Sequence, residues 1–140
     1  MLRPLAVFVL LVAVACTHES RASVHGSVPA PNPTGCYAIV YERPGFKGVG
    51  DVFNGPGRWS RLERLAETNE GNWRNRIRSR HVGGVATVTV YVDEAFKGES
   101  RQFSPSSDHP RLDTRFSGRI ESLEMTCKSA GADGAPRDHR

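Results

Sequence analysis

The residue types that most often carry chemistry in enzymes, histidine and cysteine, are few and scattered in this chain. No two histidines have the His-x-x-x-His spacing of a zinc site; they are His18, His25, His81, His109 and His139. Asp108 and His109 could form an acid and base pair, but the surrounding SSDHPR sequence is typical of a turn. The chain has neither a Gly-x-Ser-x-Gly elbow nor a glycine-rich phosphate loop before a helix. We therefore expect a protein that is not an enzyme.

Cys16 ends a segment with the pattern of an export signal. Residues 1–15, MLRPLAVFVLLVAVA, combine an early arginine, an apolar run and small residues near the end. The run is too short to span a membrane. The stretch from Ala13 to Cys16 resembles a bacterial lipoprotein box, which favours cleavage before Cys16 and lipid attachment to its thiol. Cleavage by an ordinary signal peptidase is the alternative, and either route predicts an extracytoplasmic protein, lipid-anchored in the cell envelope or secreted.

The other two cysteines, Cys36 and Cys127, form an even pair in a compartment where disulfides persist. We predict that they are bonded, which stabilises a loop of that length by about 4 to 5 kcal/mol in the simple chain-entropy treatment. Two free or separately buried thiols are the alternative. The bond would join the ends of one domain, residues 36–127, between a flexible Ser/Pro/Gly-rich tether at 16–35 and a disordered tail at 128–140.

The domain is predicted to be all-β. The formal net charge of +4 is too small to indicate a nucleic-acid binder. Apolar residues recur with a period of two in two short stretches: Tyr37, Ile39 and Tyr41, then Val88, Val90 and Val92. A helical spacing occurs once, and it predicts a short helical turn in the first half: Trp59, Leu62, Leu65 and Ala66.

A Tyr-x4-Phe-x-Gly pattern occurs twice. VYERPGFKG at residues 40–48 recurs as VYVDEAFKG at 90–98, and RIRS at 76–79 recurs as RIES at 119–122. These matches predict two duplicated motifs, about 36–83 and 84–127, that bury their apolar faces against each other. The spacing is that of a hairpin folded back over its sheet, because glycine allows a positive φ and its missing side chain lets an aromatic ring lie against the backbone.

These residues resemble the Greek-key motif of the βγ-crystallins, with Tyr41, Phe46 and Gly48 in one copy and Tyr91, Phe96 and Gly98 in the other. In that family each motif ends in a strand whose serine hydroxyl bonds the folded hairpin, and Ser79 and Ser122 occupy those places. The resemblance implies two four-stranded Greek keys packed as a β-sandwich. Two unrelated hairpins in another sandwich, with ordinary core rings, are the alternative.

The resemblance also raises the question of calcium. Many microbial members bind two calcium ions through two Asn/Asp residues, two variable positions, Ser/Thr and Ser, because calcium needs several oxygen ligands. The equivalent segments here are RNRIRS at 74–79 and SGRIES at 117–122. Arg78 stands at the fifth position of the first, where a permanent cation cannot coordinate a metal. In the second, Glu121 and Ser122 are weak candidate ligands near Arg119, so we expect no tightly bound calcium and no other cofactor.

Four arginines alternate along a stretch that we expect to be a strand: Arg74, Arg76, Arg78 and Arg80. On one strand they would share a face and form a cationic stripe. Such a stripe would contact anions, such as lipopolysaccharide phosphates, acidic glycans or a protein partner. The alternative is a solvated sheet face balanced by acidic side chains of the first motif: Glu63, Glu67 and Glu70.

The leading functional hypothesis is a noncatalytic, exported βγ-crystallin-like structural or binding module of the cell envelope, with degenerate calcium motifs. Its partner is unknown, an envelope component or another protein, with membrane contact only through a lipid anchor and no nucleic acid. One alternative is a secreted peptidase inhibitor that presents the long segment from Asn54 to Asn72, with Pro56 and Gly57, to an enzyme. A weak calcium-binding module is the other.

Overall fold

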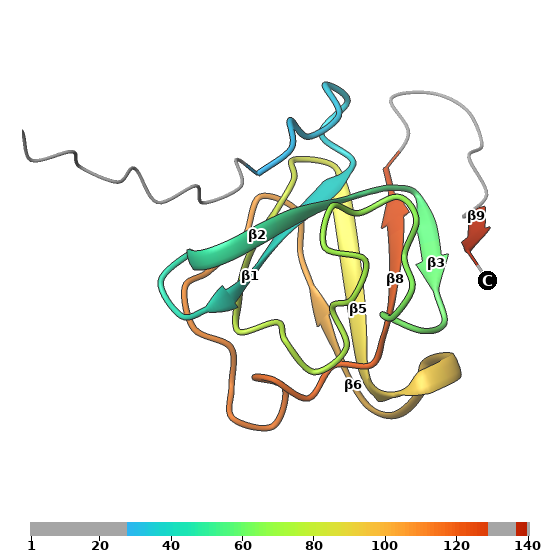
Figure 1. The fold of residues 1–140 in the computed structure, drawn as a ribbon. Coiled ribbons are helices and arrows are strands. Elements are labelled where there is room, and N and C mark those ends of the chain that lie inside the picture. Colours follow the sequence, from blue (N-terminus) through green and yellow to red (C-terminus); the bar gives the residue numbers. More distant parts are fainter. Residues whose placement is uncertain (1–27, 129–136, 140) are drawn as a thin grey trace, which may run out of the picture.

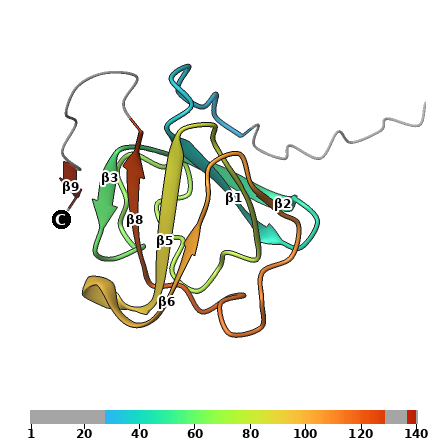
Figure 2. The same ribbon diagram turned by 180° about the vertical axis from the view of Figure 1, so that it is seen from behind.

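The computed structural model describes residues 28–128 and 137–139, and within them all regular elements but one short turn are strands (Figure 1, Figure 2). The strands are β1 (Tyr37–Arg43), β2 (Lys47–Asn54), β3 (Gly57–Trp59), β4 (Ser79–Val82), β5 (Ala86–Asp93), β6 (Lys97–Phe103), β7 (Asp108–His109), β8 (Ser122–Cys127) and β9 (Arg137–His139). The turn is the 3-10 helix η1 (Glu94–Phe96). The expected export signal, Cys16 and most of the tether lie outside the described residues. Within the described part, no helix is long and apolar enough to cross a membrane.

The strands form two sheets. The first has the order β2-β1-β4-β7, and the second has the order β6-β5-β8-β3-β9. Each motif gives its third strand to the other sheet, so β3 of the first motif pairs with β8 of the second, and β7 of the second pairs with β4 of the first. The predicted all-β sandwich of two Greek keys is confirmed, and the exchanged strands lock the two motifs together.

The core lies between the sheets. Alternate residues of β1 and β5 point inward, including Ala38, Val40, Val88 and Val90, while Tyr37, Ile39 and Tyr41 lie on the half-buried outer face. This alternation follows from the period of two along a strand. Large side chains fill the centre: Phe53, Trp59, Trp73 and Phe116 are all buried.

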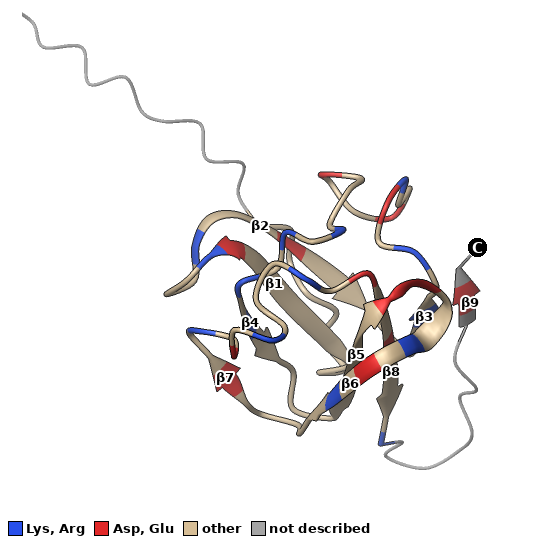
Figure 3. Ribbon diagram, turned by 90° about the horizontal axis from the view of Figure 1, so that it is seen from below, with Lys and Arg blue, Asp and Glu red and all other residues tan. Residues whose placement is uncertain are grey.

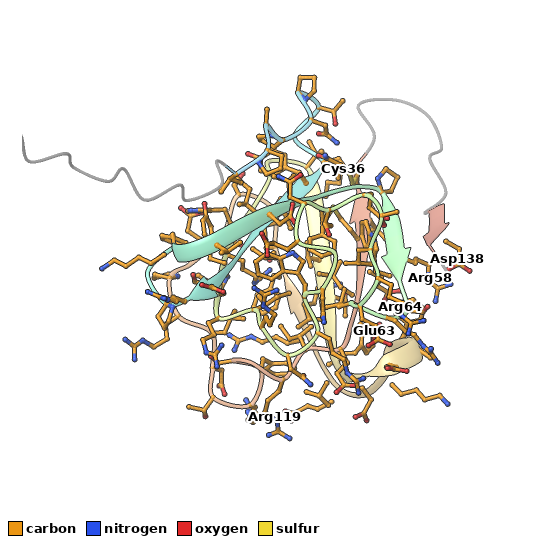
Figure 4. All side chains as sticks on the ribbon, in the orientation of Figure 1. Cys36, Arg58, Glu63, Arg64, Arg119 and Asp138 are labelled. Atoms are coloured by element: carbon orange, nitrogen blue, oxygen red, sulfur yellow. A yellow bond between two sulfur atoms is a disulfide. The ribbon has the colours of Figure 1, made fainter. Side chains whose placement is uncertain are left out.

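Cys36 and Cys127 are bonded, with their Cα atoms 5.7 Å apart. Cys36 (Figure 4) directly precedes β1 of the first sheet, and Cys127 ends β8 of the second. The bond therefore links the two sheets as well as the two ends of the repeat. The predicted pairing is present.

The helical turn predicted in the first motif is wrong. Trp59 ends β3, and residues 60–73 form bends, turns and an isolated bridge between Glu63 and Asn72. Leu62 and Leu65 are buried as their apolar character requires, but Arg64 has a φ of 57°, outside the right-handed helical region. The Leu62 N–H donates to the Glu121 carbonyl at 3.0 Å, so a tertiary hydrogen bond replaces a helical one.

The two ends of the domain are more ordered than the sequence predicts. In the described part of the tether, the Asn32 N–H donates to Asn54 Oδ1 at 2.9 Å, and Asn32 Nδ2 donates to the Cys36 carbonyl at 2.8 Å. In the expected tail, β9 pairs in parallel with β3. The physical reason is that β3 would otherwise leave a row of unpaired backbone groups at the sheet edge.

Candidate functional site

The two folded hairpins are fastened by serines in the same way. Ser79 Oγ accepts a hydrogen bond from the Phe46 N–H at 3.0 Å and donates to the Arg43 carbonyl at 2.6 Å. In the second motif Ser122 Oγ accepts from the Phe96 N–H at 3.0 Å and donates to the Asp93 carbonyl at 2.6 Å. We call these two arrangements the serine latches. Both serines are fully buried.

The ring pairs of the two hairpins also correspond. The Tyr41 and Phe46 rings have centroids 5.8 Å apart at 65°, and those of Tyr91 and Phe96 are 5.8 Å apart at 73°. These are edge-to-face contacts, the arrangement that aromatic quadrupoles favour. The structure therefore brings the repeated tyrosine and phenylalanine together in each copy.

Gly48 and Gly98 each have a φ of 77°, which L side chains rarely adopt. The sequence predicts that an aromatic ring lies against the space left by each missing side chain, but in the described part of the chain the atoms nearest to that space belong to no ring. A Cβ at Gly48 would lie 2.6 Å from Glu42 Cγ, and a Cβ at Gly98 would lie 2.8 Å from Val92 Cγ2. In the first hairpin Gly50 lies against the repeated tyrosine instead, since its Cβ would lie 2.9 Å from the Tyr41 ring. The hairpin turns so tightly that aliphatic and acidic side chains fill this space instead.

The two segments that correspond to the calcium motifs lie side by side and bond each other reciprocally. The Asn75 N–H donates to the Ile120 carbonyl at 2.9 Å, and the Gly118 N–H donates to the Ile77 carbonyl at 2.9 Å. These four residues occupy equivalent positions in the two copies. We call segments 74–79 and 117–122 the interlocked loops.

Arg78 brings a permanent positive charge to the interlocked loops. A Cβ placed on Gly118 would lie 3.3 Å from Arg78 Nη2, so the guanidinium is beside the backbone of the second loop. Arg78 Nη1 also donates to the Glu42 carbonyl at 3.4 Å. A cation in this position repels a metal ion and offers it no lone pair.

Glu121, the carboxylate of the second loop, is held by groups of the first loop. Arg74 Nη2 donates to both of its oxygens, at 3.2 and 3.1 Å, and Asn75 Nδ2 donates to Oε1 at 3.0 Å. The bond to Glu121 and its negative charge raise the pKa of Arg74. The other weak candidate ligand, Ser122, uses its hydroxyl in a latch. The residues of these loops therefore do not fit a calcium ion, and residues 28–128 and 137–139 contain no group of three or more His, Cys, Asp or Glu that could hold a metal.

The four arginines of the expected stripe do not share a face. β4 begins only at Ser79, so Arg74, Arg76 and Arg78 precede the strand, whereas Arg80 lies within it and is buried. Arg76 contacts Glu42 at 3.2 Å, and Figure 3 shows basic and acidic positions interspersed over the described part of the domain. The stripe prediction is corrected because a strand periodicity cannot apply to residues that lie in turns. Arg119 lies at the lower margin of the domain in Figure 4.

The acids expected to balance these arginines have separate roles. Glu63 lies 3.8 Å from Arg74, and Glu70 lies 3.8 Å from Arg76. Glu67 instead accepts a hydrogen bond from Trp59 Nε1 at 2.6 Å. Glu63 and Glu70 therefore contribute to the charge balance of these arginines, at distances typical of exposed pairs.

Asp108 and His109 do not bond each other. Asp108 Oδ1 lies 2.6 Å from Nδ1 of His81, whose ring stacks on Phe46 with centroids 3.9 Å apart. His109 packs on Phe103 instead, with centroids 4.9 Å apart. Successive strand residues point to opposite faces, which explains why these neighbours have different partners.

The sequence reasoning missed Asp51, a fully buried carboxylate. It accepts hydrogen bonds from Trp73 Nε1 at 3.1 Å, from the Glu70 N–H at 3.0 Å and from the Val52 N–H at 2.9 Å. These bonds fasten the end of the long first-motif segment to β2. The available signal was a lone acid within the otherwise apolar VGDVF strand.

A cavity of about 490 Å³ lies beside the long first-motif segment, lined by residues 60–61, 63–67 and Asp138. Glu63, Arg64 and Asp138 lie on the same side of the domain in Figure 4. Its lining combines acids and arginines with Ser60, Leu65 and Ala66, without a histidine or cysteine.

Comparison with solved structures identifies the fold. A domain solved in work on the evolution of the eye lens βγ-crystallin domain fold matches with a TM-score of 0.61 and 19% identity over 72% of this chain and 95% of that domain. A βγ-crystallin domain from Flavobacterium johnsoniae matches at 0.55, with 22% identity over 67% and 98% of the two chains. One from Clostridium beijerinckii matches at 0.53, with 22% identity over 63% and 94%. No protein-family model and no curated protein sequence matches the chain. The chain therefore has the βγ-crystallin domain fold.

Proposed function

We propose that this protein is a noncatalytic structural module of the cell envelope whose fold is stable without calcium. The observation that carries the proposal is the pair of arginine contacts in the interlocked loops. Arg78 lies against the Gly118 backbone, and Arg74 binds both oxygens of Glu121. In this account the chain supplies its own cations at the two places where many microbial relatives of this fold bind metal.

The test is a calcium titration of purified residues 17–140 while the melting temperature is followed. Because any ligand of the native state raises its stability, a calcium-binding domain must melt higher as calcium is added. We expect no shift at millimolar calcium relative to the same protein in chelator. A rise that exceeds the rise in equal magnesium would contradict the proposal.

Export is the second element of the proposal. The Cys36–Cys127 disulfide supports it, because such bonds persist mainly in oxidising compartments. Lipid attachment at Cys16 is expected to make maturation sensitive to globomycin, and Cys16→Ala should release the mature protein from the membrane fraction. Globomycin-resistant maturation of the wild type would favour ordinary cleavage and secretion.

The peptidase-inhibitor alternative depends on the segment from Asn54 to Asn72. Leu62 and Leu65 anchor this segment in the core, and the Leu62 carbonyl accepts the N–H groups of Trp73 and Arg74 at 2.6 and 2.9 Å. We propose that its role is to close the sandwich. Inhibition of a thermolysin-type or a serine protease by stoichiometric amounts of the protein would replace this proposal with the inhibitor function.

A further inference from the structure

One pair of equivalent positions is apolar in one half of the sandwich and basic in the other. In the second sheet, β3 pairs with β8 so that Trp59 faces Leu123. In the first sheet, the corresponding strands β7 and β4 pair so that His109 faces Arg80. Trp59 and Leu123 are fully buried, and Arg80 is only 1% exposed. One half therefore has an apolar pair where the other half has two basic side chains.

The rings beside these pairs also correspond. Trp59 packs on Phe53 with centroids 5.1 Å apart, and His109 packs on Phe103 with centroids 4.9 Å apart. Phe53 and Phe103 are matched residues of the repeat. The backbone framework of the two sites is thus the same, and the substitution of basic for apolar side chains is what distinguishes them.

Arg80 has no hydrogen-bond partner for any of its guanidinium nitrogens. Nε, Nη1 and Nη2 are all buried and unpartnered within the described part of the chain. The guanidinium lies over the Phe103 ring, 2.9 Å from its centroid. Contact with a ring face attracts the cation, but the five N–H donors point outward in the guanidinium plane and are not satisfied by it. A buried, unpaired charge is strongly unfavourable unless another group compensates it.

The immediate surroundings of Arg80 add positive charge. Arg101 of β6 lies over the same ring at 5.2 Å, and its side chain is 40% exposed. Burial and the charge of Arg101 lower the pKa of Arg80 to about 8. Burial and both guanidinium groups also lower the pKa of His109, against the opposing effect of Asp108. Among the described residues, Asp113 lies 3.8 Å from Arg101, but no acid accepts a hydrogen bond from the guanidinium of Arg80, so this cluster attracts a negative charge.

The cluster lies beside the end strands of the two sheets. β6 is the end strand of the second sheet, and β7 is the end strand of the first. Residues 104–107 join these two strands, and Ser104 and Ser106 are exposed. The half-exposed Arg101 therefore connects solvent with the buried guanidinium of Arg80.

We infer that Arg80, Arg101 and His109 form a binding site for one small anion, an inorganic ion or a single carboxylate group, that enters between β6 and β7. The anion would accept hydrogen bonds from the guanidinium nitrogens that the protein leaves unpartnered. Guanidinium groups suit this role because their planar donors bind oxyanions in a bidentate manner. The site is independent of the interlocked loops and of the proposed structural function.

The experiment is thermal unfolding of residues 17–140 in a zwitterionic low-salt buffer at pH 7.5, with inorganic phosphate, acetate or chloride added in separate titrations. An anion at ten times its dissociation constant raises the folding equilibrium constant about elevenfold. For a domain of this size we expect the melting temperature to rise by about 6 to 11 °C. The three anions distinguish a phosphate site from a carboxylate or halide site, and one bound equivalent in calorimetry would show a single site.

Two leucine variants separate site binding from a general salt effect. Arg80→Leu restores the residue type of the other half at Leu123, so it should abolish the rise and melt higher than wild type without anion. Arg111→Leu removes the same charge from an exposed position, and it should keep the full rise. Arg101→Gln changes a half-exposed residue and should weaken anion binding at least tenfold with the fold intact.

The inference is overturned if none of the three anions raises the wild-type melting temperature. It is also overturned if Arg80→Leu responds to anions as strongly as wild type, or if Arg101→Gln binds as tightly as wild type. A rise confined to proteins with Arg80 would support it.

Discussion

Replacing Ser79 or Ser122 by alanine removes one hydroxyl that ties a folded hairpin to the last strand of its motif. Each hydroxyl accepts a hydrogen bond at 3.0 Å and donates one at 2.6 Å. A buried backbone group left without its partner costs about 1 to 3 kcal/mol, so two such groups set an upper range of about 2 to 6 kcal/mol. The partner residues at the hairpin tips are exposed or half-buried, which lets water replace part of the loss. We therefore expect each variant to lose about 2 to 3 kcal/mol of unfolding free energy.

Equilibrium unfolding in guanidinium chloride measures this loss through the fluorescence of the two buried tryptophans, Trp59 and Trp73. The melting temperature should fall by about 8 to 24 °C for a domain of this size. Because the distances are the same in both copies, the two variants should agree within about 1 kcal/mol. Ser100→Ala, at an exposed position on β6, is the matched control and should change the free energy by less than about 0.5 kcal/mol. If either latch variant behaves like this control, the serine hydroxyls do not hold the hairpins.

Three further predictions concern the disulfide, the turn glycines and the half-buried His109. Replacing Cys36 and Cys127 by serine should lower the unfolding free energy by about 4 to 5 kcal/mol, and an unchanged denaturation midpoint would contradict this. Gly48→Ala and Gly98→Ala should each cost about 1 to 3 kcal/mol because of the positive φ, whereas a wild-type melting curve would show that the hairpins tolerate a side chain. The folded-state pKa of His109 is lowered, so its contribution to stability is present above the ordinary pKa of about 6.5 and is lost as the pH falls toward the folded-state value. Arg80 of β4 and Arg101 of β6 are the charged groups that lower the pKa of this imidazole from neighbouring strands, and Asp108 of its own strand opposes them. In low-salt buffer His109→Gln should melt with a weaker dependence on pH between about 7 and 5 than wild type, and equal slopes would refute this linkage.

The repeat made the architecture predictable from the sequence. Fixed spacing of tyrosine, phenylalanine and glycine specifies a local hairpin, and the serine that ends the second matched block, RIRS or RIES, marks the strand that fastens it, although the two copies differ in the length between the blocks. The pairing of Cys36 with Cys127 followed from the number of cysteines and the expected compartment. These features appear as local sequence patterns or as the number of cysteines, so a single sequence is enough to predict them.

Other features depend on contacts that no local pattern records. Leu62 and Leu65 have helical spacing, but the Leu62 N–H donates to the Glu121 carbonyl and the Leu62 carbonyl accepts from the Trp73 N–H, which favours an irregular path. β9 forms because β3 has a free edge, which is a property of the assembled sheet. The inward direction of Arg80 depends on β4 starting at Ser79, a boundary that the alternating arginines did not reveal.

Direct calorimetric titration with calcium tests the central claim, that arginines provide the cations of the interlocked loops. The account predicts no binding heat for the wild type at millimolar calcium. It predicts weak binding by Arg78→Ser, which removes the guanidinium and restores a hydroxyl at the fifth position of the first loop. Binding by the wild type with a dissociation constant of about 10⁻⁴ M or lower, the range of extracellular calcium modules and tighter sites, would contradict the account.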